Sequence, residues 1–168
     1  RSTSVVRQPF EVIGSFLEAL AAVGAHEELP GGRVVHVELV RVHAVGRGAQ
    51  TPHDWMALDG SLWMEDGVPY MVFCHEWAQI TDGSFDIVRL SADLSTAVGE
   101  PRLLFHASAA PWVRCRGDIG ELYQGRRYHA YVSDGNWLHR TRTGTLLMLW
   151  SSYGPEKYAV GLARSISG

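Results

Sequence analysis

The chain of 168 residues lacks several features that would assign it to a class of protein. It has two cysteines, Cys74 and Cys115, which form no metal-binding spacing. The eight histidines are scattered singly without an HxH or HExxH pattern, so we expect no histidine-based catalytic metal. Lys and Arg form no run and the formal net charge is −3, which argues against nucleic acid as a partner.

Long apolar stretches are absent as well. No segment is long and apolar enough to span a membrane, so we expect no membrane partner. No basic, apolar and small-residue series marks a signal peptide, which favours a cytoplasmic location. The sequence begins with Arg1 rather than Met, as a processed or incomplete chain would.

The first part of the chain also lacks most aromatic residues, because all six tryptophans and all six tyrosines follow position 50. Apolar residues at helical spacing predict a helix over Pro9–Val23, which would end at Gly24. Alternation over Arg33–Val45 predicts a half-buried strand. We therefore divide the chain into an N-terminal segment, 1–50, without a visible catalytic constellation, and a second domain, 51–168.

The second domain contains two similar stretches. Leu58–Trp77 reads as two strands joined by a turn, with Asp59 near the start of the first strand and Glu76 after the second. A stretch that begins at Asp134 repeats this order: Asp-Gly, a short strand, a turn with glycine and an aromatic-rich strand. Further strands are predicted over 85–91, 102–106 and 158–165.

Antiparallel units of three or four short strands indicate an all-β fold, either blades of a β-propeller or a β-sandwich. In a propeller the innermost strands of the blades line one channel, so Asp59 and Asp134 would converge there. Hydrolysis of a glycosidic bond requires paired carboxyl groups, one to protonate the leaving oxygen and one to activate water. The pattern therefore predicts a carbohydrate substrate.

From about residue 51 to 168 the chain resembles glycoside hydrolase family 43. The resemblance lies in TPHDW (51–55) and in the stretches LDGSLWMEDGVPYMVFCHEW, VSDGNWLHR, GTLLMLWSS and YAVGLARSISG. Members of this family are five-bladed propellers that act on arabinose-, xylose- or galactose-containing glycans. The resemblance implies inverting hydrolysis, and it implies that this chain carries about two of the five blades.

The resemblance also suggests roles for the acids. Asp59 matches the family aspartate that orients the general acid and tunes its pKa. Asp134, Gly135 and Asn136 align with the family's Glu-Gly-Pro, whose glutamate is the general acid, so Asp134 is a shorter match and Asn136 replaces the proline. Glu76 is the alternative proton donor. The family's general base should lie upstream of Asp59, where no aspartate precedes Asp54, so we expect a fragment that lacks the base.

Four further residues are candidates for contacts with sugar. Trp63, Trp77 and Trp137 could stack on sugar rings, although a tryptophan in such a strand is more often part of the core, and Arg114 lies in an expected loop over the pocket. We expect no cofactor; the family allows a structural cation, whose ligands the sequence does not identify. Two alternatives to an enzyme stay open. One is a carbohydrate-binding or inactive remnant, and the other is self-association through open blade edges.

Overall fold

The computed structural model of the protein describes residues 10–15, 50–123 and 126–166. These residues form mainly antiparallel β-strands, which confirms the all-β prediction. The strands are β1 (Phe10–Ser15), β2 (Ala57–Glu65), β3 (Val68–His75), β4 (Ser84–Leu90), β5 (Ala97–His106), β6 (Arg116–Tyr123), β7 (Arg126–Ala130), β8 (Asp134–Arg140), β9 (Leu146–Tyr153) and β10 (Tyr158–Ser165). A short helix, α2 (Trp77–Ile80), and a 3-10 turn (Ala107–Ala109) join some of them.

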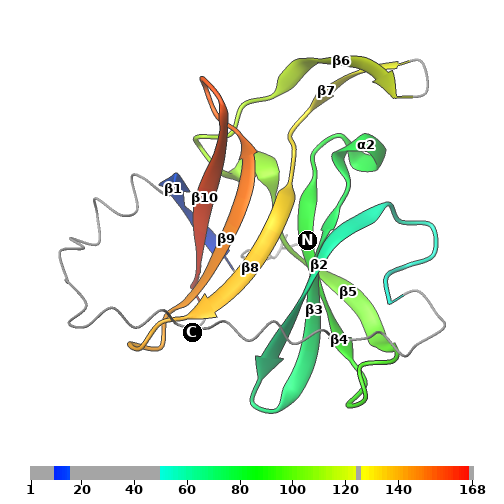
Figure 1. Ribbon diagram of the computed structural model, residues 1–168, viewed down its shortest axis with the longest axis vertical. Coiled ribbons are helices and arrows are strands. Elements are labelled where there is room, and N and C mark those ends of the chain that lie inside the picture. Colours follow the sequence, from blue (N-terminus) through cyan, green and yellow to red (C-terminus); the bar gives the residue numbers. More distant parts are fainter. Residues whose placement is uncertain (1–9, 16–49, 124–125, 167–168) are drawn as a thin grey trace, which may run out of the picture.

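The strands build two four-stranded sheets and a two-stranded ribbon (Figure 1). The first sheet has the order β2-β3-β4-β5, and the second has the order β1-β10-β9-β8. Gly67 and Gly144, with φ of 76° and 89°, occupy the tight turns after β2 and β8, where left-handed backbone favours glycine. The two predicted units are therefore two antiparallel sheets, with the β6–β7 ribbon between them in sequence.

The helix predicted over Pro9–Val23 is wrong for the part that the structure describes. Residues 10–15 form β1, which pairs antiparallel with β10. The edge of β10 offers backbone hydrogen-bond partners, and FEVIGS contains the β-branched residues Val12 and Ile13, so sheet pairing outweighs the helical spacing. Residues 16–23 and the strand predicted over Arg33–Val45 lie outside the described residues.

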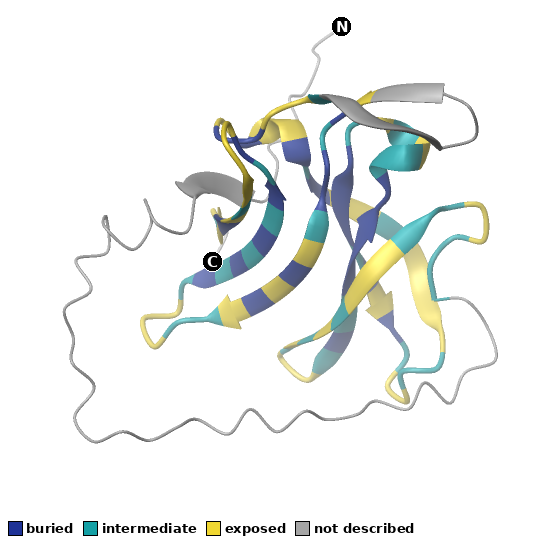
Figure 2. Cartoon of the chain, turned by 45° about the horizontal axis from the view of Figure 1, so that its top comes forward, coloured by how far each residue is buried: buried dark blue, intermediate teal, exposed yellow. Residues whose placement is uncertain are grey.

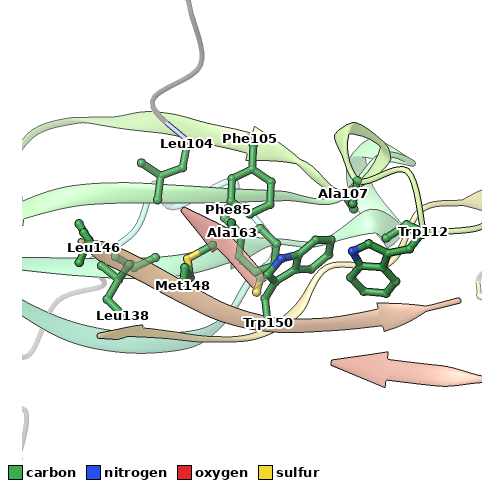
Figure 3. Packing of buried hydrophobic residues seen from close by; sticks show 14 residues of the cluster. Phe85, Leu104, Phe105, Ala107, Trp112, Leu138, Leu146, Met148, Trp150 and Ala163 are labelled. Carbon is green, nitrogen blue, oxygen red and sulfur yellow. The ribbon is translucent and has the colours of Figure 1, made fainter. Parts of the chain in front are cut away.

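The hydrophobic core lies between the two sheets (Figure 3). Strands β8 and β9 alternate between buried and more exposed residues, so each turns one face to this core (Figure 2). The ring of Trp150 lies at its centre, with centroids 5.1 Å from Phe85, 5.5 Å from Phe105 and 5.0 Å from Trp112. Because these rings come from both sheets and from the loop after the 3-10 turn, the aromatic cluster fixes the two sheets against each other.

A smaller cluster lies on the opposite face of the first sheet. It consists of Phe73, Val88 and Leu90, with Trp55 packed against them. Among the described residues no helix is long and apolar enough to cross a membrane.

Gly161 on β10 offers a test of the core packing. A Cβ atom at this position would lie 2.1 Å from Cζ2 of Trp112, so the Gly161→Ala substitution must displace the indole. We expect a loss of about 1–3 kcal/mol in the free energy of unfolding, as for other overpacked cores. Chemical denaturation measures it. In a Trp112→Leu background the same substitution should cost clearly less, and an equal cost in both backgrounds would contradict this packing.

Candidate active site

Two β-bulges face each other where the sheets meet. The pairing of β2 with β3 skips Asp59, which has a left-handed φ of 53°. The pairing of β8 with β9 skips Gly135, with φ of 48°. Strand β8 packs against both β2 and β3. Bulges free backbone groups from the ladder and re-aim side chains, and they are common beside active sites.

The freed groups of the two bulges bind each other across the sheets. The backbone N–H of Gly135 donates to Oδ2 of Asp59 at 2.8 Å. The Nδ2 of Asn136 donates to the carbonyl oxygen of Asp59 at 2.5 Å, and the Ser61 hydroxyl donates to Oδ1 of Asn136 at 2.5 Å. Residues of β8 thus donate hydrogen bonds both to the main-chain carbonyl of Asp59 and to its carboxylate.

Asp134 is held within its own sheet. The phenolic OH of Tyr158 donates to Oδ2 of Asp134 at 2.5 Å, and the Ser151 hydroxyl lies 3.0 Å from that phenol oxygen. Burial raises the pKa of Asp134, the Tyr158 hydrogen bond opposes this shift, and the charge of Asp59 adds to it. Burial and the neighbouring Asp134 raise the pKa of Tyr158, so the phenol stays protonated and remains a donor.

Glu76 has a different environment. It follows β3 and precedes α2, and its N–H donates to the carbonyl of Met56 at 2.8 Å. The residue is 7% exposed, and its Oε1 has no hydrogen-bond partner within the part of the chain that the structure describes. Burial, followed by the charges of Asp134 and Asp59, raises the pKa of Glu76 to about 7. A substantial fraction of Glu76 is therefore protonated near neutral pH.

The side-chain amide of Gln79 links the loop before β2 to the end of β3, next to Glu76. The Oε1 of Gln79 accepts the N–H of Met56 at 2.7 Å and lies 2.8 Å from Nε2 of His75, while its Nε2 donates to the carbonyl of Asp54 at 2.7 Å. Trp55 stacks on His75, with ring centroids 4.1 Å apart and an interplanar angle of 13°. These contacts fix the backbone from which Glu76 projects.

The three predicted acids therefore lie close enough for their charges to interact. Cys74 lies buried below them, and its pKa is raised by burial first and then by the charges of Asp59, Asp134 and Glu76. A fully buried thiol with a raised pKa stays protonated, so Cys74 acts as a buried apolar residue and not as a nucleophile. The roles of the individual acids stay predictions.

Trp63 is not brought to the acids. It lies near the turn end of β2, away from the Asp59 bulge, and its Nε1 donates to Glu65 at 2.8 Å. Arg140 pairs with the same Glu65 at 2.6 Å and lies over the Trp63 ring, 5.8 Å from its centroid. Trp63 also packs against the core, so its surroundings are those of a structural residue.

The other predicted sugar contacts lie at varied positions. Trp77 directly follows Glu76 and is half-buried, and Trp137 on β8 is 57% exposed, three positions after Asp134. The guanidinium of Arg114 donates to the carbonyls of Pro111 and Val113 in its own loop. Trp77 is therefore adjacent to an acid in sequence and Trp137 lies on the same strand as one, while Arg114 is engaged locally.

Sequence reasoning missed Tyr158, Ser61 and Gln79. Tyr158 figured only as the start of a predicted strand, and its contact with Asp134 depends on how β8, β9 and β10 are aligned. Ser61 and Gln79 are ordinary polar residues in the sequence, and they become part of the site through contacts with distant segments. The only hint in the sequence was Asn136, which departs from the family pattern and is the hydrogen-bond partner of Ser61.

The described residues contain no group of three His, Cys, Asp or Glu side chains that could hold a metal ion. The chemistry that this arrangement offers is proton transfer by a buried carboxylic acid between two further carboxylates.

Comparison with known proteins gives one informative match. No protein-family model matches the chain, and no curated protein matches it. A solved structure, an endo-arabinase from Bacteroides thetaiotaomicron VPI-5482, is similar, with a TM-score of 0.65 and 41% sequence identity. The match covers 73% of this chain and 42% of the endo-arabinase chain, so the chain spans less than half of that protein's length.

The raised pKa of Glu76 predicts a pH-dependent stability. A carboxyl whose pKa rises from 4.5 to about 7 on folding contributes stability below pH 4.5 that is lost as the pH rises through 7. The Glu76→Gln variant should therefore be more stable than the wild type at pH 8, and the gap should close towards pH 4.5. Urea unfolding across this range measures the difference. A difference in stability between the two proteins that does not change with pH would contradict the raised pKa of Glu76.

Proposed function

We propose that this chain is part of a glycoside hydrolase of the family 43 type that acts on arabinose-containing glycans. Two findings support the proposal. The chain is 41% identical to a solved endo-arabinase over the matched part, and the acids that the resemblance picks out meet at the junction of two sheets. The two four-stranded sheets correspond in this proposal to two blades of a propeller.

The observation that carries the proposal is the environment of Glu76. A general acid must be protonated at working pH and must have an oxygen free to reach the leaving group. Glu76 meets the first need, since its pKa is about 7, and its buried Oε1 has no hydrogen-bond partner among the described residues. Asp134 is less suited, because its Oδ2 already accepts a hydrogen bond from Tyr158, which favours the ionised form. We therefore assign Glu76 as the proton donor.

Asp134 and Asp59 then help to keep the proton on Glu76. Burial is the largest cause of the raised pKa of Glu76, and the charges of Asp134 and Asp59 add to it. After Glu76 protonates the glycosidic oxygen, a base-activated water would attack the opposite face of the sugar, with inversion. The resemblance places that base upstream of Asp59, and the proposal leaves it to another part of a complete propeller.

Exposed aromatic surface beside the acids supports a sugar as substrate. The Trp137 indole is 57% exposed, on the same strand as Asp134. Aromatic faces bind the apolar faces of sugar rings, so this residue is the one we assign to substrate stacking.

Substitution of the acids separates their roles. In a complete propeller that carries this chain, Glu76→Gln should lower release of reducing sugar from arabinan by about 10²–10⁴-fold, because no acid protonates the leaving oxygen. The loss should be much smaller on an aryl arabinoside whose phenolate leaves without protonation. Asp134→Asn should retain more activity than Glu76→Gln. It should also shift the alkaline limb of the pH–rate profile to lower pH, because the charge of Asp134 raises the pKa of Glu76.

Glu65→Gln serves as the control for this series, because Glu65 is a surface acid paired with Arg140, away from the cluster. If Glu76→Gln kept the wild-type rate on arabinan while Asp134→Asn abolished it, the roles of the two acids would be reversed.

Carbohydrate binding without turnover is the second candidate function, and the exposure of Trp137 favours it equally. Calorimetric titration with arabinan oligosaccharides, run beside the sugar-release assay with arabinan and xylan, separates the two. Binding that Trp137→Ala weakens, with no sugar released by a complete propeller that carries this chain, would establish the second function over the first.

A further inference from the structure

We propose that Asn136 is a positioning residue that holds Asp59 in place beside Glu76 and Asp134. The inference deepens the proposed function and rests on it for its catalytic meaning, while its geometry stands on contacts of this chain. Asn136 occupies the position where the resembled family has proline, a residue without a side-chain hydrogen-bonding group.

The amide meets a need that the β2 bulge creates. Because the β2–β3 ladder skips Asp59, its carbonyl lies outside the regular strand pairing. The Nδ2 of Asn136 supplies a donor to this carbonyl at 2.5 Å, in a contact that is partly buried. Asn136 is itself 8% exposed, so water competes little for this bond.

The amide is held in one orientation. Its Oδ1 accepts the hydroxyl of Ser61 at 2.5 Å, and its Nδ2 also lies 3.8 Å from Sγ of Cys74. One side chain from β8 therefore contacts residues of β2 and β3. Rotation of the amide would exchange donor and acceptor and break both short bonds.

The position of the Asp59 carboxylate depends on this main-chain contact. Asp59 has a left-handed φ of 53°, a conformation that non-glycine residues adopt only when their surroundings impose it. The same residue reaches the N–H of Gly135 through its carboxylate. Asn136 and Gly135 thus hold Asp59 at two points, and loss of the first should let the bulge relax and the charge move away from Glu76.

A double-mutant cycle tests this inference. Titration of the Glu76 carboxyl by NMR, in the full chain without substrate, gives its pKa in the wild type, Asp59→Asn, Asn136→Leu and the double variant. Leucine keeps the side-chain volume while removing the amide. We expect Asn136→Leu to lower the Glu76 pKa, by less than Asp59→Asn does, because part of the like-charge effect of Asp59 is lost. In the Asp59→Asn background the same substitution should add no shift.

Ser152→Ala is the matched control, since Ser152 is a buried side chain that donates one hydrogen bond to a backbone carbonyl, that of Val132 rather than that of Asp59. It should lower stability without moving the Glu76 pKa. If Asn136→Leu does not fold, Ser61→Ala must give a smaller shift in the same direction.

Three results would overturn the inference: an unchanged Glu76 pKa in Asn136→Leu, an equal shift in both Asp59 backgrounds, or an unmoved pKa in Ser61→Ala where that variant is needed. A complete propeller that carries this chain and releases no sugar would refute the enzyme proposal instead, and the titration would still decide the role of Asn136.

Discussion

The contact between the Gly135 N–H and the Asp59 carboxylate joins the two sheets at the place where their bulges meet. Three carboxyl groups in one place repel one another when ionised, so the assembly has to be held by interactions elsewhere. The aromatic cluster around Trp150 supplies much of that stabilisation, because rings from both sheets lose contact with water there. The charged site is thus a local cost that the packed core offsets.

The three acids differ in what contacts them. Asp59 accepts a backbone N–H, Asp134 accepts a phenol, and one oxygen of Glu76 has no hydrogen-bond partner among the described residues. Hydrogen bonds to a carboxylate favour its charged form, whereas burial without them favours the neutral acid. One kind of functional group can therefore hold a proton at one position and a charge at the next, which is the division of labour that acid catalysis needs.

Much of the sheet structure could be predicted from the sequence, because turn glycines such as Gly67 and Gly144 interrupt runs with strand periodicity. The positions of Asp59 and Asp134 in matching units also predicted that they would meet. Residues 10–15 could not be placed, since their pairing with β10 depends on a segment at the other end of the chain. The contacts of Asn136 and Tyr158 were hidden for a related reason: the sequence does not contain the register of neighbouring strands or the offset that a bulge introduces.

The pairing of β1 with β10 has a consequence for how the protein is made. Strand β1 precedes its partner β10 by the whole of the first sheet and the β6–β7 ribbon, so during synthesis β1 has to wait until these elements have been made. Contacts between such distant segments form slowly, since a long chain must first be brought together. During that interval an unpaired strand can join a neighbouring nascent chain, which makes the second sheet the part of the protein most open to exchange of strands between molecules.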